Sequence, residues 1–226
     1  MTSRDQILQL ADDALILSHR CAEWLTRAPE IEEDVALANI GLDLLGQARS
    51  LYALVGDEDR LAYFRDAPEW RNCRLVELPN GDFAFSMARL LVFSSFQLTL
   101  AESAIVASDP GLSAVFAKSV KESRYHFDHA TQWVLRLGDG TAFSRQRMQV
   151  ALESIWPHVE DVFAIAPDSR SPAMAKVEGV IRRATLTVPD TAKPEWGGRQ
   201  GIHTDHLVDL LDEMQSVARQ HEGATW

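Results

Sequence analysis

Four long helical patterns constrain the fold of this 226-residue chain more than any other feature. Apolar residues that recur every three or four positions predict helices over residues 4–27, 31–55, 83–107 and 110–137. A short turn joins the first helix to the second, and another joins the third to the fourth. A connection of about 25 residues, which contains Pro68 and Pro79, separates the two pairs. The chain is therefore predicted to be all-α and built on two long helical hairpins.

Capping residues at the helix starts support these boundaries. A side-chain oxygen at such a position can satisfy backbone N–H groups that the first turn leaves without a partner. The caps are Ser3, which forms a capping box with Gln6, then Asp82, and Asp109 followed by Pro110.

The C-terminal third of the chain predicts three more helices. They cover residues 145–166, with a bend at Pro157, about 172–186, and a last helix that Thr204 or Asp205 caps. Two hairpins joined by a crossing connection are the ferritin-like four-helix-bundle layout. We therefore expect one ferritin-like domain over residues 1–226, with a four-helix core over 1–137 and accessory helices over 138–226.

The apolar periodicity also predicts which helix faces are buried. On the second helix the core stripe is Ile31, Val35, Ala38, Leu42, Leu45 and Tyr52. Beside it runs a small or polar stripe that would let another helix approach closely: Ala36, Asn39, Asp43, Gly46 and Ser50. The third helix is apolar almost all round, so we expect it to be buried on several sides. The core stripe of the fourth helix is Phe116, Val120, Ser123, Phe127, Ala130, Val134 and Leu137.

Composition limits the kinds of binding partner and the cellular compartment that we expect for this protein. The net charge of −11 at pH 7 argues against nucleic acid and against an anionic membrane surface as partners. Cys21 and Cys73 form no CxxC motif, which suits a reducing cytosol. No apolar run approaches the ~18–20 residues of a membrane span, and Asp12 and Asp13 interrupt the N-terminal run. We expect a cytoplasmic protein with neither nucleic acid nor a membrane as partner.

The segment Lys118–His129 resembles a metal-binding motif that has lost residues. A ferritin-like bundle places a Glu-x-x-His pair at this level, and a di-metal carboxylate site needs four carboxylates and usually two histidines. Tyr125 stands three residues after Glu122, and Gly46 stands three residues after Asp43. The facing helices add too few ligands for two metals. The degenerate metal-site positions are Asp43, Gly46, Gln97, Glu122, Tyr125 and His126.

These positions leave more than one interpretation open. The simplest is that Glu122 and His126 form hydrogen bonds or ion pairs at a helix interface, so we assign no metal ligand and no catalytic residue. Glu122, His126 and His129 also share one side of a helix and could hold a single ion. The alternative function is therefore a freestanding metal-binding oxidase or iron-binding bundle that uses Asp43, Glu122 and His126.

The connection between the hairpins holds an excess of arginine for an acidic protein: Arg60, Arg65, Arg71 and Arg74. Such side chains can be solvated and paired with neighbouring carboxylates. They can also bind an anionic group, such as a phosphate, or an acidic partner.

Other catalytic motifs are missing from the sequence. It contains no nucleophile elbow, phosphate-binding loop or dinucleotide fingerprint. The glycine-rich segment 197–201 lacks the preceding strand and the lysine of a phosphate loop, so it indicates a turn. His203 and His206 lie at a helix start, where capping by Thr204 and Asp205 explains the segment better than a metal does.

Five stretches carry a family resemblance. They are residues 36–49 (ALANIGLDLLGQAR), Pro79–Gly81 ahead of Phe83, Lys121–His126, Ala184–Pro189, and Gly197–Gly198 with Gly201–Leu207. They span most of the chain, and the first and last are specific. The chain resembles the non-catalytic C subunits of bacterial phenylacetyl-CoA epoxidases, which are multicomponent monooxygenases.

The resemblance implies a protein that has the fold of a catalytic sister subunit but lacks its di-iron ligands, in agreement with Gly46 and Tyr125. The implied complex adds one oxygen atom to the ring of phenylacetyl-CoA, with electrons from NADPH passed by a reductase that carries flavin and iron–sulfur groups. This chain would hold no cofactor. The implied partners are the catalytic sister, the other epoxidase components and the CoA ester at the interface. Because a CoA ester carries phosphates, the arginine-rich connection would then line the edge of a substrate or partner surface: Arg65, Glu69, Trp70, Arg71 and Asn72. We expect the isolated chain to be able to form a homodimer.

Overall fold

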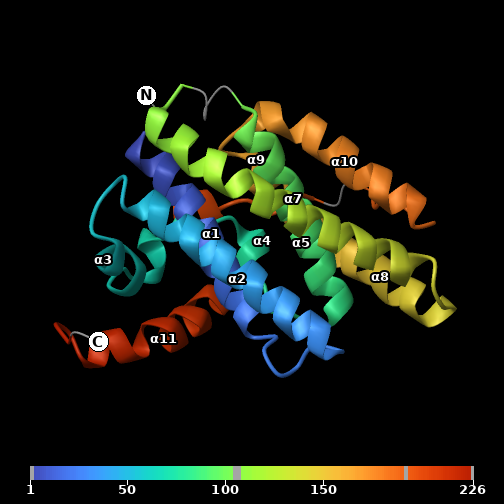
Figure 1. Cartoon of the computed structure of the whole chain (residues 1–226), viewed down its shortest axis with the longest axis horizontal. Coiled ribbons are helices and arrows are strands. Elements are labelled where there is room, and N and C mark those ends of the chain that lie inside the picture. The colour runs from blue at the N-terminus through green and yellow to red at the C-terminus, as the bar shows by residue number, and fades with distance from the viewer. Residues whose placement is uncertain (1–2, 104–107, 191–192, 225–226) are drawn as a thin grey trace. The chain divides into compact units, whose positions relative to one another are not determined.

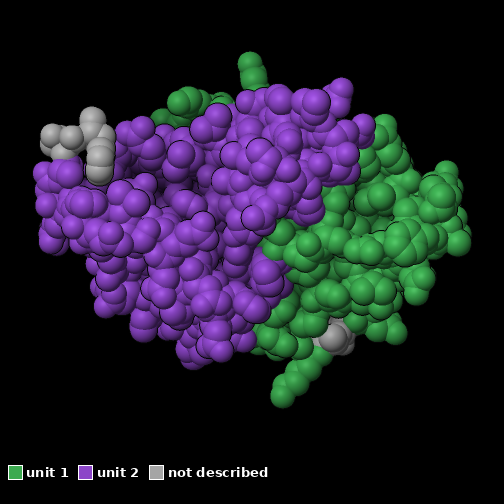
Figure 2. All heavy atoms as spheres, turned by 90° about the horizontal axis from the view of Figure 1, so that it is seen from below, with its two compact units in different colours: residues 1, 80–196 green, residues 2–79, 197–226 purple. Residues whose placement is uncertain are grey.

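The computed structural model describes residues 3–103, 108–190 and 193–224, and in these ranges the regular structure is helical, with no strand (Figure 1). The all-α prediction is confirmed. The chain divides into two compact units, coloured separately in Figure 2. Unit 1 comprises residues 80–196 with residue 1, and unit 2 comprises residues 2–79 and 197–226. The last segment of the chain lies in the same unit as the first. The expected four-helix core over 1–137 with accessory helices over 138–226 stays a prediction. That the whole chain forms one domain stays a prediction.

Unit 2 is built on the hairpin of α1 (Arg4–Ala22) and α2 (Ile31–Tyr52). Shorter elements complete it: α3 (Glu58–Tyr63), a 3₁₀ turn (Ala67–Glu69), α4 (Arg74–Glu77), a second 3₁₀ turn (Gly198–Gln200) and α11 (Asp205–Gln220). Helix α4, which the sequence did not predict, contacts α1, and α11 contacts both α3 and α4.

Unit 1 is built on the hairpin of α5 (Phe83–Ala101) and α7 (Pro110–Gly138). The rest of the unit is α8 (Ala142–Ile155), a 3₁₀ turn (Trp156–His158), α9 (Val159–Phe163), a 3₁₀ turn (Pro167–Ser169) and α10 (Arg170–Arg183). The predicted bend at Pro157 is the 3₁₀ turn between α8 and α9. Helix α5 contacts α7, α8, α9 and α10, and most of its residues are buried, as predicted.

Helix α5 is also apolar enough to raise the question of a membrane span. Among the described residues it is the one helix whose length and composition would allow it to cross a membrane. This corrects the expectation that no run of that kind exists. Because 83% of that stretch is buried inside the structure, the core of the protein accounts for its apolar composition.

The predicted caps are confirmed at three helix starts. The Gln6 N–H donates to Ser3 Oγ (3.2 Å) while the Ser3 N–H donates to Gln6 Oε1 (2.9 Å), which is the capping box. The Asp82 and Asp109 carboxylates each accept backbone N–H bonds from the first turns of α5 and α7. Thr204, one of the two predicted caps of the last helix, is the N-cap residue of α11, but its side chain accepts no hydrogen bond from the first turn of that helix.

The buried face of α2 is not the one that the sequence indicated. Ile31, Val35 and Leu42 of the predicted core stripe are 78%, 56% and 65% exposed, and only Tyr52 of that stripe is fully buried. The face that packs inward is Leu37, Ile40, Gly41, Leu44, Gln47, Ala48, Leu51 and Tyr52. Gly41 lies at the contact with α1, where a Cβ would be 3.4 Å from Cys21 Cβ. The helix has two apolar stripes, and periodicity alone does not say which of them faces the core.

Two glycines of unit 1 allow a matched test of this packing. A Cβ at Gly138, the last residue of α7, would lie 2.4 Å from the Ala184 carbonyl oxygen, whereas a Cβ at Gly179 in α10 meets no described atom within 4 Å. We expect Gly138→Ala to lower the free energy of unfolding by ~1–3 kcal/mol through overpacking. Gly179→Ala should raise it by ~0.5–1 kcal/mol, because the unfolded chain loses freedom. Urea unfolding measures both, and equal shifts would contradict the close contact.

His19 gives unit 2 a pH dependence. Burial lowers the pKa of the half-buried His19 imidazole; Glu213 opposes this shift and Arg20 adds to it. The unfolded chain takes up its proton near the ordinary value of 6.5, so below that pH it binds more protons than the folded chain. Stability should therefore fall as pH drops from about 6.5 through the lower folded pKa. Denaturant melts at pH 7 and pH 5 should show a smaller loss of stability in His19→Gln than in the parent protein, and an equal loss in both would contradict the role of His19.

Candidate functional site

The degenerate metal-site positions of unit 2 lie on α2. Asp43 is half-buried and Gly46 is exposed. A Cβ built at Gly46 would meet no described atom within 4 Å. A surface glycine therefore stands at the position three residues after Asp43, where a ligand histidine would be expected.

The corresponding positions of unit 1 lie on α5 and α7. Gln97 and His126 are buried, Glu122 is half-buried, and Tyr125 is 49% exposed. The Tyr125 ring centroid lies 6.2 Å from that of His126 and 6.0 Å from that of His129. Burial, reinforced by His126, lowers the pKa of His129. A half-exposed tyrosine thus occupies the expected ligand position, and the buried histidine follows one residue later.

A di-iron centre does not fit the residues of this chain. In the part of the chain that the structure describes, no group of three or more His, Cys, Asp or Glu side chains is placed to hold a metal ion. Such a centre would require a larger set of carboxylates and histidines than this. Neither Asp43 within unit 2 nor Glu122 and His126 within unit 1, the residues of the oxidase alternative, belong to such a group among the described residues.

The first of three buried polar clusters in unit 2 surrounds Asp12 of α1. Arg65 donates to its carboxylate from Nη2 (2.5 Å) and Nη1 (3.0 Å), the Tyr52 hydroxyl donates at 2.6 Å, and the Arg71 N–H donates at 2.8 Å. The Arg65 guanidinium also lies 4.3 Å from the centroid of the Trp70 ring. These contacts attach the connection after α2 to α1.

Tyr52 and Arg65 both keep their protons in this cluster. Burial raises the pKa of Tyr52 well above its ordinary value, and Asp12 raises it further, so the hydroxyl keeps the proton that it donates. Burial alone would lower the pKa of Arg65, but Asp12 and Tyr52 outweigh it and raise the pKa, so the guanidinium stays charged.

The second cluster surrounds Asp13. Its carboxylate accepts from the Cys73 N–H and from Arg199 Nη2, both at 2.7 Å. Arg199 Nη1 also donates to the Gln9 and Arg71 carbonyl oxygens, each at 3.2 Å. Burial raises the pKa of Asp13, and Arg199 and Cys73 oppose that shift. This ion pair attaches the 197–201 turn to α1.

The third cluster surrounds Glu77 of α4. Its carboxylate accepts from the Thr204 N–H (2.7 Å) and from Asn72 Nδ2 (3.0 Å), and it lies 2.8 Å from His203 Nδ1. His203 Nε2 lies 3.0 Å from the Trp70 carbonyl oxygen. Both ring nitrogens of His203 are therefore engaged with oxygen atoms inside this cluster, while His206 is exposed.

The glycine-rich segment 197–201 is a turn, as predicted, and the structure explains its glycines. Gly201 has φ +77°, and a Cβ there would lie 2.4 Å from the Pro68 carbonyl oxygen. Gly197 has φ +136°. A side chain at Gly201 would be strained and would also push apart the segments that Arg199 joins.

The predicted substrate or partner edge is largely internal. Arg65, Trp70 and Asn72 are buried. Glu69 is exposed, and the half-buried Arg71 donates from its guanidinium to backbone carbonyls of the same connection. The edge stays a prediction, and only Glu69 and Arg71 are accessible to a ligand.

Sequence reasoning missed the acidic members of these clusters, Asp12, Asp13 and Glu77, and also Arg199. One signal was present: two adjacent aspartates interrupt the apolar run of the first helix. Charged side chains in such a run are rarely buried unless they are paired, so they indicate hidden cations.

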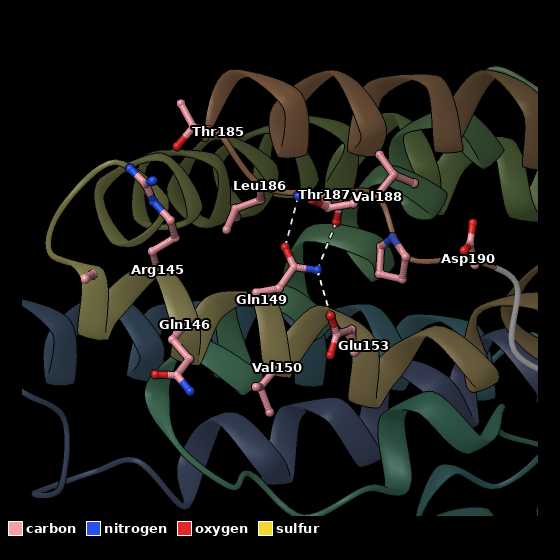
Figure 3. Close-up of a pocket in the computed structure, with 12 residues that line it drawn as sticks. Arg145, Gln146, Gln149, Val150, Glu153, Thr185, Leu186, Thr187, Val188 and Asp190 are labelled. Carbon is pink, nitrogen blue, oxygen red and sulfur yellow. Dashed lines mark hydrogen bonds between the residues drawn. The ribbon is translucent and has the colours of Figure 1, made fainter.

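A groove of about 890 Å³ in unit 1 lies between α8 and the extended segment after α10 (Figure 3). The Gln149 side-chain amide holds its two walls together. The Thr187 N–H donates to Gln149 Oε1 (2.9 Å), and Gln149 Nε2 donates to the Thr187 carbonyl (3.1 Å) and to Glu153 (3.0 Å). The segment Ala184–Pro189, one of the five stretches of sequence resemblance, forms one wall.

Comparison with known proteins defines the class of this chain. The family model described as "Phenylacetic acid catabolic protein" matches residues 1–226. The chain therefore belongs to that family, and its helical structure agrees with the fold class expected from the sequence. It is 41% identical, over 240 aligned residues, to the C subunit of the 1,2-phenylacetyl-CoA epoxidase of Escherichia coli (strain K12). The alignment covers 97% of this chain and 97% of that protein, which confirms the resemblance.

The Asp12 cluster leads to a stability test. Arg65→Met keeps much of the apolar stem but leaves a buried carboxylate without its cation, so we expect a loss of ~3–5 kcal/mol in the free energy of unfolding. The double variant Asp12→Asn/Arg65→Met should recover part of that loss. Urea unfolding provides the measurement. In the control, Arg49→Met breaks an exposed ion pair with Glu58 and should hardly move the midpoint. Equal shifts for Arg65 and Arg49 would show that the buried pair is unimportant.

Proposed function

We propose that this chain is the non-catalytic subunit of a di-iron monooxygenase that epoxidises the aromatic ring of phenylacetyl-CoA. In this proposal it pairs with a catalytic ferritin-like sister subunit and stabilises it. The observation that carries the proposal is the 41% identity to the C subunit of a 1,2-phenylacetyl-CoA epoxidase, along 97% of both chains. The alignment extends along nearly all of this chain and of that relative.

The ligand positions support a role without chemistry in this chain. Glycine has no side chain to offer a metal at Gly46, and Tyr125 stands at the other expected histidine position. The described residues gather no set of three or more ligand side chains elsewhere. In the proposal, the di-iron chemistry belongs to the sister. The buried polar contacts of Asp12, Asp13 and Glu77 keep unit 2 rigid, so that it presents a fixed surface.

The remaining parts of the proposal concern the complex. A reductase that carries flavin and iron–sulfur groups passes electrons from NADPH, and this chain holds no cofactor of its own. The complex works in the cytoplasm. The CoA ester lies at the shared surface, where Glu69 and Arg71 are the accessible members of the predicted edge.

Co-expression with the catalytic sister tests the pairing. We expect the two chains to elute together on gel filtration after tag-free purification, and the sister to gain solubility and epoxidase activity with the reductase. The chain alone should convert no phenylacetyl-CoA under the same conditions. Separate elution, with a sister that is equally soluble and active by itself, would contradict the proposal.

Metal analysis tests the alternative of a freestanding oxidase. We expect the isolated chain, purified from iron-supplemented cultures, to hold far less than one iron per chain, with no change in Glu122→Ala. The sister, prepared in parallel, should hold close to two. Near-stoichiometric iron that disappears in Glu122→Ala would instead favour the oxidase.

A further inference from the structure

Helix α2 carries a second apolar stripe that unit 2 does not bury. Ile31, Val35 and Leu42 are 78%, 56% and 65% exposed, and Ala38 and Leu45 on the same line are half-buried. We call these five residues the α2 seam. The opposite face of the helix holds the fully buried Leu37, Ile40 and Leu44, so the seam is additional to the core.

The spacing of the seam is that of a helix–helix contact. Its residues follow one another at intervals of four, three, four and three, which is the repeat that keeps a stripe facing a partner helix along its length. With a rise of about 1.5 Å per residue, the seam is roughly 21 Å long. Single exposed apolar side chains are ordinary on protein surfaces, whereas a continuous row along one helix marks an interaction surface.

The residues beside the seam favour close approach by a helix. Asn39 and Gly46 lie on one flank, and the Cβ position of Gly46 is open. Glycine inside a helix costs roughly 0.5–1 kcal/mol relative to alanine, and no described contact within the chain requires it here. A partner backbone packed closely against this flank would explain why a glycine stands at position 46.

Charge distinguishes the candidate occupants. Glu32 and Asp34 flank the N-terminal end of the seam, and Asp43 lies beside its centre. A second copy of this chain also carries a net charge of −11, so it would bring further negative charge to a surface that is already acidic. A helix whose apolar ridge is flanked by lysine or arginine is complementary to this surface.

We propose that the α2 seam is the docking surface for such a helix on the catalytic sister subunit. This inference rests on the proposed function, and it adds the identity of the face through which the chain contacts its partner. A seam ~21 Å long and about one helix diameter wide covers far less than the ~800 Å² per partner of a stable interface. The seam is therefore the apolar centre of a wider contact, and the interaction energy concentrates in Val35 and Leu42.

Matched valines test the surface. Val35 on α2 and Val217 on α11 are 56% and 57% exposed, and both belong to unit 2. With the purified sister as the probe, Val35→Arg and Leu42→Arg should each weaken binding at least ~30-fold, the effect of losing a hot-spot residue. Val217→Arg should change the affinity less than about threefold. All three should unfold in urea like the parent protein, because the substituted side chains face solvent.

Two further variants test separately whether the partner helix approaches closely and whether charge contributes to binding. Gly46→Gln should raise the urea midpoint, since glutamine favours the helix, and yet weaken binding to the sister by blocking close approach. Glu32→Lys should weaken binding at low salt and reduce its salt dependence.

The outcomes distinguish the two proposals. If the parent chain binds the sister and the α2 variants bind as well as Val217→Arg, the docking surface is overturned and the proposed function stands. If the parent chain does not bind the sister at all, the proposed function fails as well. If the α2 variants abolish only a homodimer of this chain, the occupant is a second copy and the inference is wrong.

Discussion

Two neighbouring aspartates inside α1, Asp12 and Asp13, are the constraint on which unit 2 depends. A buried carboxylate is costly unless a cation and hydrogen-bond donors surround it. Arg65 supplies the cation for Asp12 from 53 residues away, and Arg199 supplies it for Asp13 from 186 residues away. One turn of one helix therefore anchors both the connection that follows α2 and the C-terminal return of the chain.

Unit 1 is held together in a different way. Its centre is α5, whose buried apolar residues contact four other helices, with edge-on ring packing between Phe96 and Phe163 at 5.6 Å. Such packing is non-directional and tolerates changes that conserve volume. The ion pairs of unit 2 demand defined geometry. Unit 1 therefore has an apolar core centred on one helix, whereas ion pairs hold the loops of unit 2 in defined positions.

These arrangements bear on what the protein does. The helices where a ferritin-like protein would hold its metals are present, but glycine and tyrosine stand at two ligand positions, and the described residues gather no ligand set. The arginine-rich connection contains polar residues that the sequence suggested for ligand binding. Most of them instead form contacts that stabilise unit 2. Unit 2 also presents an exposed apolar face on α2. In our proposals, this chain therefore acts through its surface and leaves the oxygen chemistry to its partner.

Local patterns in the chain were sufficient to predict the helical class and the starts of the four long helices, including the capping box of Ser3 and Gln6, and the break at Pro157. The resemblance of five stretches indicated the family. The boundaries depend on residues three or four positions apart, so a short window of sequence contains them. Which stripe of α2 is buried, and which charges meet at Asp12, Asp13 and Glu77, emerged only once the chain was folded. Two apolar stripes on one helix have the same period, and the partners of a buried carboxylate lie far away along the chain. Neither choice leaves a local trace in the sequence.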